Sequence, residues 1–585
     1  MTSIDDLFKK PNAPGKRKIE PLTDPEKVYK SAKISANSDA KQPRASSVED
    51  DDGEEAGPQL PPESEEEDYG PDDEEGRFFG SGLDEGTKDA MDYLDEQDGE
   101  ETFIPEKIDS SWLKKTALNF EKRIAKNAEL RGKYEEEPQK FMGSESDLDD
   151  DIKALSILSE HSELYAEFAK LGSAAKLVSL LSHENTDIAI DAIEIISELT
   201  DEDVEAEQEQ WDALVDGLME ADILDLLTQN FDRFDETNDS DRSGVYHALG
   251  VIEHLISRPK MAETIGETTK LLPWLVSRIQ VKEARLGQNK QYAAEILSII
   301  LQSSDSTRKR FLELDGVDTL LTILAAYRKR DPQKDSEEEE YVENLFDALT
   351  CVVDEPEGKA KFVEAEGVEL CLIMLKEGKM SKARALTVLD HALADRTDTS
   401  GDVCQKLVEA EGLKRIFSLF MKKNDSSTNE HLLGIFSSLL KSLPGSSAQR
   451  IRTLAKFMEK DYEKISKTIV LRRDYATRLA AVDQRIKREQ TNLDLADREA
   501  MEDEWFSRRL DAGLFCLQTV DVILAWLVAE DDGAKKKIQE LLAKRNETLA
   551  DVKRTIQGQI DQIHVSDRAE EGALKDMLQT LLSFL

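Results

Sequence analysis

The feature of this chain that most limits its fold is an internal repeat. Three segments align by eye, and each holds an acidic residue, a glycine and an apolar helix start: FLELDGVDTLLTIL (311–324), FVEAEGVELCLIML (362–375) and LVEAEGLKRIFSLF (407–420). With weaker upstream copies, the matching positions, which we call the anchors, lie 44 to 51 residues apart: Gly172, Asp222, Gly266, Gly316, Gly367 and Gly412. A period near roughly 40–47 residues with only helices is typical of HEAT and armadillo solenoids.

The anchors also predict how each repeat turns. Glycine enters the left-handed region of backbone conformation at little cost, so a glycine between two apolar helices indicates a left-handed helix cap. After each anchored helix comes another apolar segment at helical spacing: 188–199, 245–256, 292–301, 341–353, 383–393 and 431–440. Alternating strand patterns are nearly absent. We therefore predict an all-α protein, an armadillo- or HEAT-like right-handed superhelical solenoid.

Periodicity and composition divide the chain into four regions. An amphipathic helix is expected at 112–134, and Pro138 and the acidic run DLDDD (147–151) are then expected to break the helical pattern. The C-terminal part has no anchor, and a solenoid must cover its last core face. The predicted regions are a disordered tail (1–108), N-terminal capping helices (109–160), armadillo-like repeats (161–444) and a C-terminal helical domain that caps them (445–585).

The charge of the chain excludes two classes of partner. Its 77 Lys and Arg against 123 Asp and Glu give a formal net charge of −46. Nucleic-acid binding and adhesion to anionic membranes both depend on basic surfaces, so we expect neither direct nucleic-acid nor membrane binding. Residues 49–101 contain 24 acidic and two basic residues and few apolar ones. This acidic tract is predicted to be disordered, because it cannot bury enough apolar surface to offset the entropy of ordering.

The tail also carries candidate signals. A basic cluster stands in a segment with Pro and Gly and is a candidate nuclear-localisation signal: Lys9, Lys10, Lys16, Arg17 and Lys18. The competing interpretation is a solvated tail without a signal, because short basic runs are common in such tails. Ser47 and Ser64 each have an acidic residue three positions later, as acid-directed kinases prefer, so both are phosphorylation candidates. The alternative for the tract is a solubilising tail without regulation.

The sequence offers no enzyme chemistry. It has no phosphate loop, no HExxH and no CxxC, so we predict no catalytic residue, no metal site and no cofactor. The four cysteines are far apart and are predicted to be buried thiols: Cys351, Cys371, Cys404 and Cys516. The most apolar stretch, 514–528, falls short of the roughly 20 residues that span a bilayer and is expected to be a buried helix.

A solenoid offers a long concave surface, which suits extended peptides. In an armadillo repeat the last helix lines that surface, so acidic and amide residues on the six apolar segments are candidates for binding basic peptides. A solvated helix face is the competing interpretation for each of them. The candidates are Glu194, Glu198, Glu253, Glu295, Asn344, Asp347 and Asp390.

Several longer motifs resemble one family. The segment FEKRIAKNAELRGKYEEEPQKFMGSESDLDDDI (120–152), the stretches HENTDI, ELTDED, NLFDAL and ALTVLDHAL, and RRLDAGLF (508–515) are similar to the beta-catenin-like protein 1 family. The resemblance runs over nearly all of 110–585. It implies a nuclear armadillo protein that associates with the spliceosome through the nineteen complex and recognises basic, localisation-like segments of splicing proteins.

This chain departs from the expected pattern in two ways. Its basic cluster is sparser than the resemblance leads us to expect, and no repeated Trp-x-x-x-Asn of the kind by which import receptors bind basic peptides is present.

The first functional hypothesis is a non-catalytic scaffold in pre-mRNA splicing. The alternatives are a nuclear transport adaptor of the import-receptor type and an acidic histone chaperone. Whether two copies form a homodimer through the C-terminal helices stays open.

Overall fold

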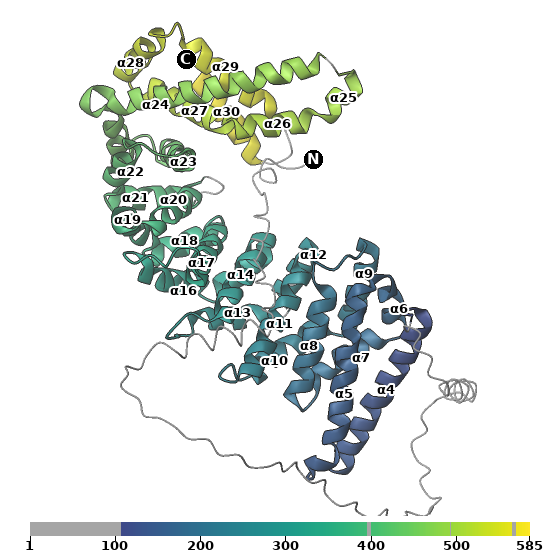
Figure 1. Ribbon diagram of the computed structural model, residues 1–585. Helices are drawn as coiled ribbons and strands as arrows, with labels where there is room; N and C mark the ends of the chain where they lie inside the picture. Colours follow the sequence, from purple (N-terminus) through teal and green to yellow (C-terminus); the bar gives the residue numbers. More distant parts are fainter. Residues whose placement is uncertain (1–106, 269, 395–398, 492, 564–568) are drawn as a thin grey trace, which may run out of the picture. The chain divides into compact units, whose positions relative to one another are not determined.

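The computed structural model describes residues 107–268, 270–394, 399–491, 493–563 and 569–585. These residues form α-helices, short 3-10 helices and turns, and they contain no β-strand (Figure 1). The all-α prediction is therefore confirmed. The basic cluster, the acidic tract, Ser47 and Ser64 lie outside the described residues.

Two antiparallel helices open the described chain, α4 (Ser110–Lys133) and α5 (Met142–Ala154), joined through the short helix η1 (Pro138–Lys140). The expected helix at 112–134 is confirmed. The expected break at 147–151 is wrong, because this run lies inside α5. Its acidic residues pair with basic side chains, as Asp151 does with Arg123 of α4 at 2.9 Å, while Leu148 on the same helix is buried.

Six repeats of three helices follow α5 in the described chain. The first helices are α6 (Tyr165–Lys170), α9 (Gln208–Glu220), α12 (Pro259–Thr268), α15 (Asp305–Glu313), α18 (Pro356–Glu364) and α21 (Ser400–Glu409). The second helices are α7 (Ser173–Ser179), α10 (Ile223–Arg233), α13 (Leu271–Gln280), α16 (Gly316–Leu324), α19 (Gly367–Glu377) and α22 (Gly412–Phe420). Short helices precede or extend some of them: η2 (Leu155–Glu160), η3 (Ser162–Leu164), η4 (Leu180–Ser182) and η5 (Ala325–Tyr327).

The third helix of every repeat confirms one of the six predicted apolar segments. These helices are α8 (Thr186–Thr200), α11 (Asp239–Ile256), α14 (Gln288–Ser303), α17 (Glu337–Val352), α20 (Met380–Leu393) and α23 (Ser426–Ser442). Each packs against the third helix of the next repeat, so that the six form one continuous row (Figure 1). Their buried apolar residues belong to a single core that continues into the C-terminal helices. This arrangement is an armadillo-type solenoid.

The predicted role of the anchors is partly wrong. Gly172 does adopt the left-handed conformation, with φ of 74°, and Asp222 does the same with φ of 58°. At the three clearest copies the left-handed residue is instead the acidic one before the glycine, which is Asp315, Glu366 or Glu411.

The glycines of these three copies begin the second helix, and a methyl group would not fit there. A Cβ on Gly316 would lie 2.2 Å from the Phe311 ring, and one on Gly367 would lie 2.3 Å from the Phe362 ring. Gly266 lies inside α12, where a Cβ would meet Thr307 of α15 at 2.0 Å. Close packing, rather than backbone conformation, therefore requires glycine at these positions.

Among the described residues after α23, seven helices follow: α24 (Ala448–Gln490), α25 (Leu495–Ala500), α26 (Glu502–Asp511), α27 (Leu514–Glu530), α28 (Asp532–Ala543), α29 (Leu549–Gln562) and α30 (Ala569–Leu582). The apolar stretch at 514–528 is α27, a largely buried helix that packs against α23, α24, α28, α29 and α30. A buried ion pair joins it to α24, because the guanidinium of Arg472 donates to both oxygens of Asp521 at 2.6 and 3.2 Å.

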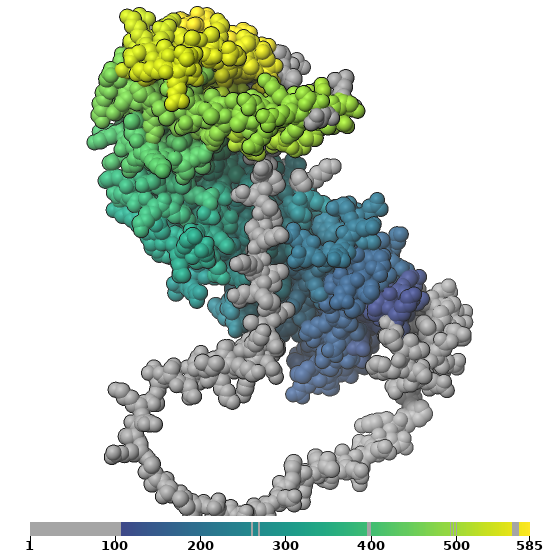
Figure 2. Space-filling view, turned by 45° about the horizontal axis from the view of Figure 1, so that its top comes forward, coloured from purple at the N-terminus to yellow at the C-terminus, as the bar shows by residue number. Residues whose placement is uncertain are grey.

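Helix α24 is broken by a sharp kink within its length. Glu459 has an extended backbone, and Lys460, Asp461 and Tyr462 all have positive φ between 54° and 62°. Before the kink, Phe457 packs edge-on against Phe417 of α22 and Phe436 of α23. The long part after it runs to α25, and α26 packs back against α24. In Figure 2 this light-green pair of helices stands out from the yellow C-terminal helices.

Candidate functional site

The row of third helices holds all seven predicted groove residues, and most of them contact a neighbouring helix. Glu194 of α8 is the most exposed of the seven predicted groove residues, with 53% of its side chain open to solvent. One of its oxygens lies 3.9 Å from Nε2 of His247 on α11. Burial lowers the pKa of His247, while the Glu194 charge opposes that shift. Glu194 therefore remains available to a ligand.

Two further carboxylates, Glu198 and Glu253, accept hydrogen bonds from hydroxyl groups. The hydroxyls of Ser156 and Ser159 donate to one oxygen of Glu198, at 2.6 and 3.1 Å. The hydroxyl of Tyr292 on α14 donates to Glu253 on α11. Each contact joins segments about one repeat apart, so these acids also help hold neighbouring repeats together.

The later repeats show the same pattern. The side-chain amide of Gln291 donates to Glu295 at 3.1 Å, one turn along α14. Asp347 of α17 accepts a hydrogen bond from the Arg384 guanidinium of α20 at 3.1 Å, and burial raises its pKa. Arg384 also pairs with Glu343 at 2.6 Å. Asn344 lies next to Glu343 and is half-buried.

Asp390 of α20 pairs with His431 of α23, with 2.9 Å between the carboxylate oxygen and Nδ1. Its side chain is 20% exposed. The side chains of Asp347 and Asp390 are thus already paired with basic side chains of the next third helix. A ligand that reached them would have to compete with Arg384 and His431.

An acidic hollow of about 560 Å³ lies beside the end of α8. Of its lining residues, sequence reasoning had proposed only Glu198. The others come from the short helices η2 and η3 and from the loop after α8, and no pattern in the sequence places these two segments together. The lining residues are Ser159, Glu160, Ser162, Glu163, Glu198, Asp201, Asp203, Val204 and Glu205.

The hollow carries six carboxylates and no basic side chain, which suits Lys and Arg as ligands. Asp201 is 43% exposed and lies 3.7 Å from Nε2 of His254 on α11. One turn before Glu194 on α8, burial and the Asp149 carboxylate raise the pKa of Asp191 to about 7. Asp191 is therefore partly neutral near neutral pH, and the negative charge at this end of the row comes mainly from Glu194 and the six carboxylates of the hollow.

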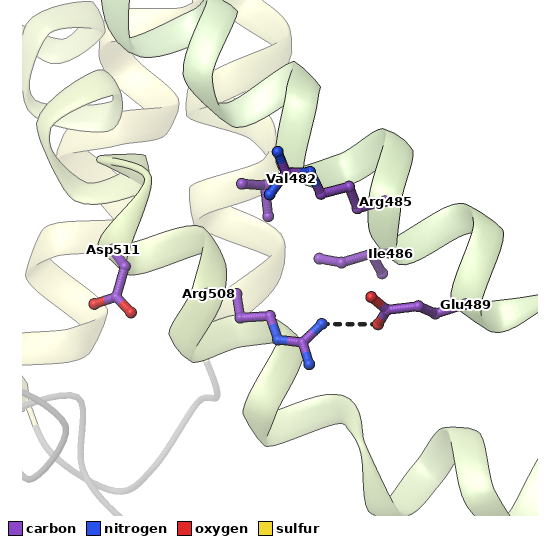
Figure 3. A pocket seen from close by; sticks show the side chains of 6 residues that line it. All are labelled: Val482, Arg485, Ile486, Glu489, Arg508 and Asp511. Carbon is purple, nitrogen blue, oxygen red and sulfur yellow. Dashed lines mark hydrogen bonds and ion pairs between the residues drawn. The ribbon is translucent and has the colours of Figure 1, made fainter.

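A second hollow, of about 310 Å³, lies between α24 and α26 (Figure 3). Arg508 of α26 reaches across to Glu489 of α24 at 2.8 Å, and Ile486 forms an apolar wall. Asp511 points away from this pair in Figure 3. Because both charged partners are paired across the gap, the contact serves to hold the two helices together.

The described residues show no arrangement suited to metal chemistry. No group of three or more His, Cys, Asp or Glu side chains among them could hold a metal ion. Three of the four cysteines are buried and Cys351 is half-buried, and all four are free thiols. Burial raises the pKa of Cys371 to about 12 and that of Cys516 to about 11, which leaves both unreactive near neutral pH.

No single helix among the described residues is long and apolar enough to cross a membrane. The bent pair of α26 and α27 meets that length and composition only when both are taken together.

Comparison with known proteins assigns the family. The family model described as "Catenin-beta-like, Arm-motif containing nuclear" matches residues 88–557. The chain belongs to this family. It is 40% identical over 475 residues to the beta-catenin-like protein 1 homolog of Schizosaccharomyces pombe, covering 81% of this chain and 82% of that relative.

Animal members of the family are similarly close. Beta-catenin-like protein 1 of Homo sapiens is 36% identical over 465 residues, covering 77% of this chain and 81% of the relative. Among solved structures, a designed armadillo repeat protein aligns with a TM-score of 0.35 at 17% identity, covering 45% of this chain and 98% of that one. The fold assignment rests on the three-helix repeats and the family model.

Proposed function

We propose that the protein is a non-catalytic interaction scaffold of the spliceosome that associates with the nineteen complex in the nucleus. In this proposal the acidic residues along the third helices bind basic, localisation-like segments of splicing proteins. The nuclear and splicing parts rest on the family: its description reads nuclear, and the motif resemblance implies the nineteen complex.

The observation that carries the proposal is the charge of the repeat region. Residues 161–444 contain 55 Asp and Glu against 31 Lys and Arg, whereas residues 445–585 are nearly balanced, with 25 against 24. Within the repeats, Glu194 and Asp201 stand at or beside the acidic end of the row with about half their side chains exposed. The negative charge of the repeats would attract a basic peptide, and the affinity for that peptide would fall as salt screens the attraction.

The composition of the third helices argues against the transport-adaptor alternative. The five tryptophans of the chain lie on α4, α9, α13, α26 and α27, and none is on a third helix of the six repeats. A Trp and Asn ladder is therefore missing where a basic peptide would lie. The histone-chaperone alternative depends on residues 49–101, which are outside the described residues.

The test uses the full chain and a labelled Lys- and Arg-rich peptide. Charge reversal at Asp347 or Asp390 would also break contacts between repeats, so the exposed acids are the better choice. Glu194→Gln combined with Asp201→Asn removes two charges, and we expect the affinity to fall about tenfold and its salt dependence to weaken.

The matched control is Glu135→Gln combined with Glu136→Gln, which removes two exposed charges outside the repeats. This control should leave the affinity unchanged. Equal losses in both variants, or none in either, would count against binding along the third helices. Affinity purification and mass spectrometry of the native protein should recover core splicing proteins; their absence would count against the splicing assignment.

A further inference from the structure

A second charged surface runs along one edge of the repeats and has the opposite sign. The loops between second and third helices in the third to sixth repeats are 281–287, 328–336, 376–379 (with the last turn of α19) and 421–425. Together they hold ten Lys and Arg against five Asp and Glu, although residues 110–444 as a whole are strongly acidic. We call the exposed bases of these four segments the basic rim.

The four segments lie on the same edge because second helices run in the same direction in successive repeats. Contacts between neighbouring repeats support this. The hydroxyl of Tyr341, at the start of α17, donates to the carbonyl of Ile279, at the end of α13, at 2.8 Å. The backbone N–H of Met380 donates to Asp331 of the preceding repeat's loop at 3.2 Å, and α19 packs against α22.

The bases of the rim are open to solvent. The side chains of Lys329 and Arg330 are 65% exposed, that of Lys334 is 85% exposed and that of Lys376 is 51% exposed. Among ion pairs between described residues, none involves Lys282, Arg285, Lys379, Lys422 or Lys423.

Four of the five acidic residues of the same loops are engaged within the protein, and the fifth, Asp335, is 84% exposed and lies 3.8 Å from Lys334. Glu283 pairs with the buried Arg278 at 2.8 Å, and Asp425 accepts from the N–H of Thr428 at 2.7 Å as a helix cap. Glu377 pairs with Lys329 at 3.0 Å. Those four carboxylates thus serve local structure, while several of the bases do not.

The dipoles of the second helices explain only part of the excess of Lys and Arg in the rim. Cations near a helix C-terminus interact favourably with the helix dipole. However, the equivalent segments of the first two repeats, 183–185 and 232–238 with the last turn of α10, contain one base, Arg233, against Glu184, Asp232, Asp235 and Glu236. Arg233 donates to the backbone carbonyls of His183 and Glu184. The repeat can therefore be built without a basic edge, and four consecutive basic loops call for a further explanation.

We propose that the basic rim binds an extended acidic segment of a partner protein. Charges grouped two to four per loop and repeated once per armadillo unit fit a polypeptide with spaced carboxylates. RNA fits less well. The four loops carry no Phe, Tyr, Trp or His on which bases would stack.

The rim and the third-helix acids would then let the protein hold a basic and an acidic partner segment at once. This inference does not depend on the proposed function, since the two surfaces involve different residues and ligands of opposite charge.

The test measures binding of a labelled Glu-Ser repeat peptide to the full chain. The rim variant combines Arg285→Gln, Lys379→Gln, Lys422→Gln and Lys423→Gln. The matched control makes the same change in net charge at exposed positions away from the rim, with Lys122→Gln, Lys170→Gln, Lys536→Gln and Lys544→Gln.

We expect the rim variant to lose at least about tenfold in affinity and part of its salt dependence, while the control keeps both. The unlabelled basic peptide should not displace the acidic one. Equal losses in both variants, or no binding by the wild type, would overturn the proposal. Tighter binding of a single-stranded RNA that is lost in the rim variant would also overturn it, because the rim would then be a phosphate site.

Discussion

Gly367 illustrates what a single position can and cannot reveal in sequence. The repeat identifies this position as an anchor. A glycine in a turn is required either because its backbone has a positive φ or because a side chain would not fit there. The structure gives the positive φ of 58° to Glu366 and places Gly367 against the Phe362 ring. The second explanation needs the position of a ring five residues earlier, which only the folded repeat supplies.

The residue-scale prediction follows from this contact. Gly367→Ala should destabilise the protein by about 1–3 kcal/mol, because the added Cβ must push the buried Phe362 ring aside. Urea denaturation of the two proteins measures the difference. Gly558→Ala is the control, since a Cβ there meets nothing within 4 Å inside α29, and it should stabilise by about 0.5–1 kcal/mol. An unchanged midpoint for Gly367→Ala would refute the steric account.

At the scale of elements, the third helices were predictable because their apolar positions recur at helical spacing. Their starts were not. The segment predicted at 245–256 is a helix from Asp239, and the one at 341–353 begins at Glu337. Their first turns are polar and are set by side-chain caps, Asn238 and Ser336, which periodicity does not register.

The kink inside α24 had no sequence signal at all. Lys460, Asp461 and Tyr462 are ordinary helix residues by composition, yet all three are left-handed. Left-handed backbone costs a non-glycine residue roughly 1–2 kcal/mol. Packing of α24 on α21 to α23 and on α27 and α28 must therefore outweigh local preference.

This strain predicts an unusual stabilising change. Lys460→Gly should raise the free energy of unfolding by about 1 kcal/mol, because glycine adopts positive φ freely. Ala480→Gly, at an exposed position in the right-handed part of α24, should lower it by about 1 kcal/mol. Thermal or urea denaturation gives both signs. A loss of stability in Lys460→Gly would show that residue 460 is not left-handed in solution.

At the scale of the whole molecule, sequence reasoning found the acidic character of the repeats but only part of the candidate surfaces. Asp347 and Asp390 were predicted because they lie on the apolar segments, and that position does not reveal that Arg384 and His431 hold them from the next repeat. The acidic hollow and the basic rim were missed because loops far apart in sequence build them. Their charges meet only when the repeats stack.

The central claim is that basic segments bind along the third helices rather than through the acidic tract at 49–101. Hydrogen-exchange mass spectrometry of the full chain, with and without the Lys- and Arg-rich peptide, tests it most directly. Peptide binding should slow exchange in α8 and in the adjoining segments around Glu194 and Asp201 and leave the basic rim unchanged. Protection confined to residues 49–101, with none in the third helices, would contradict the account.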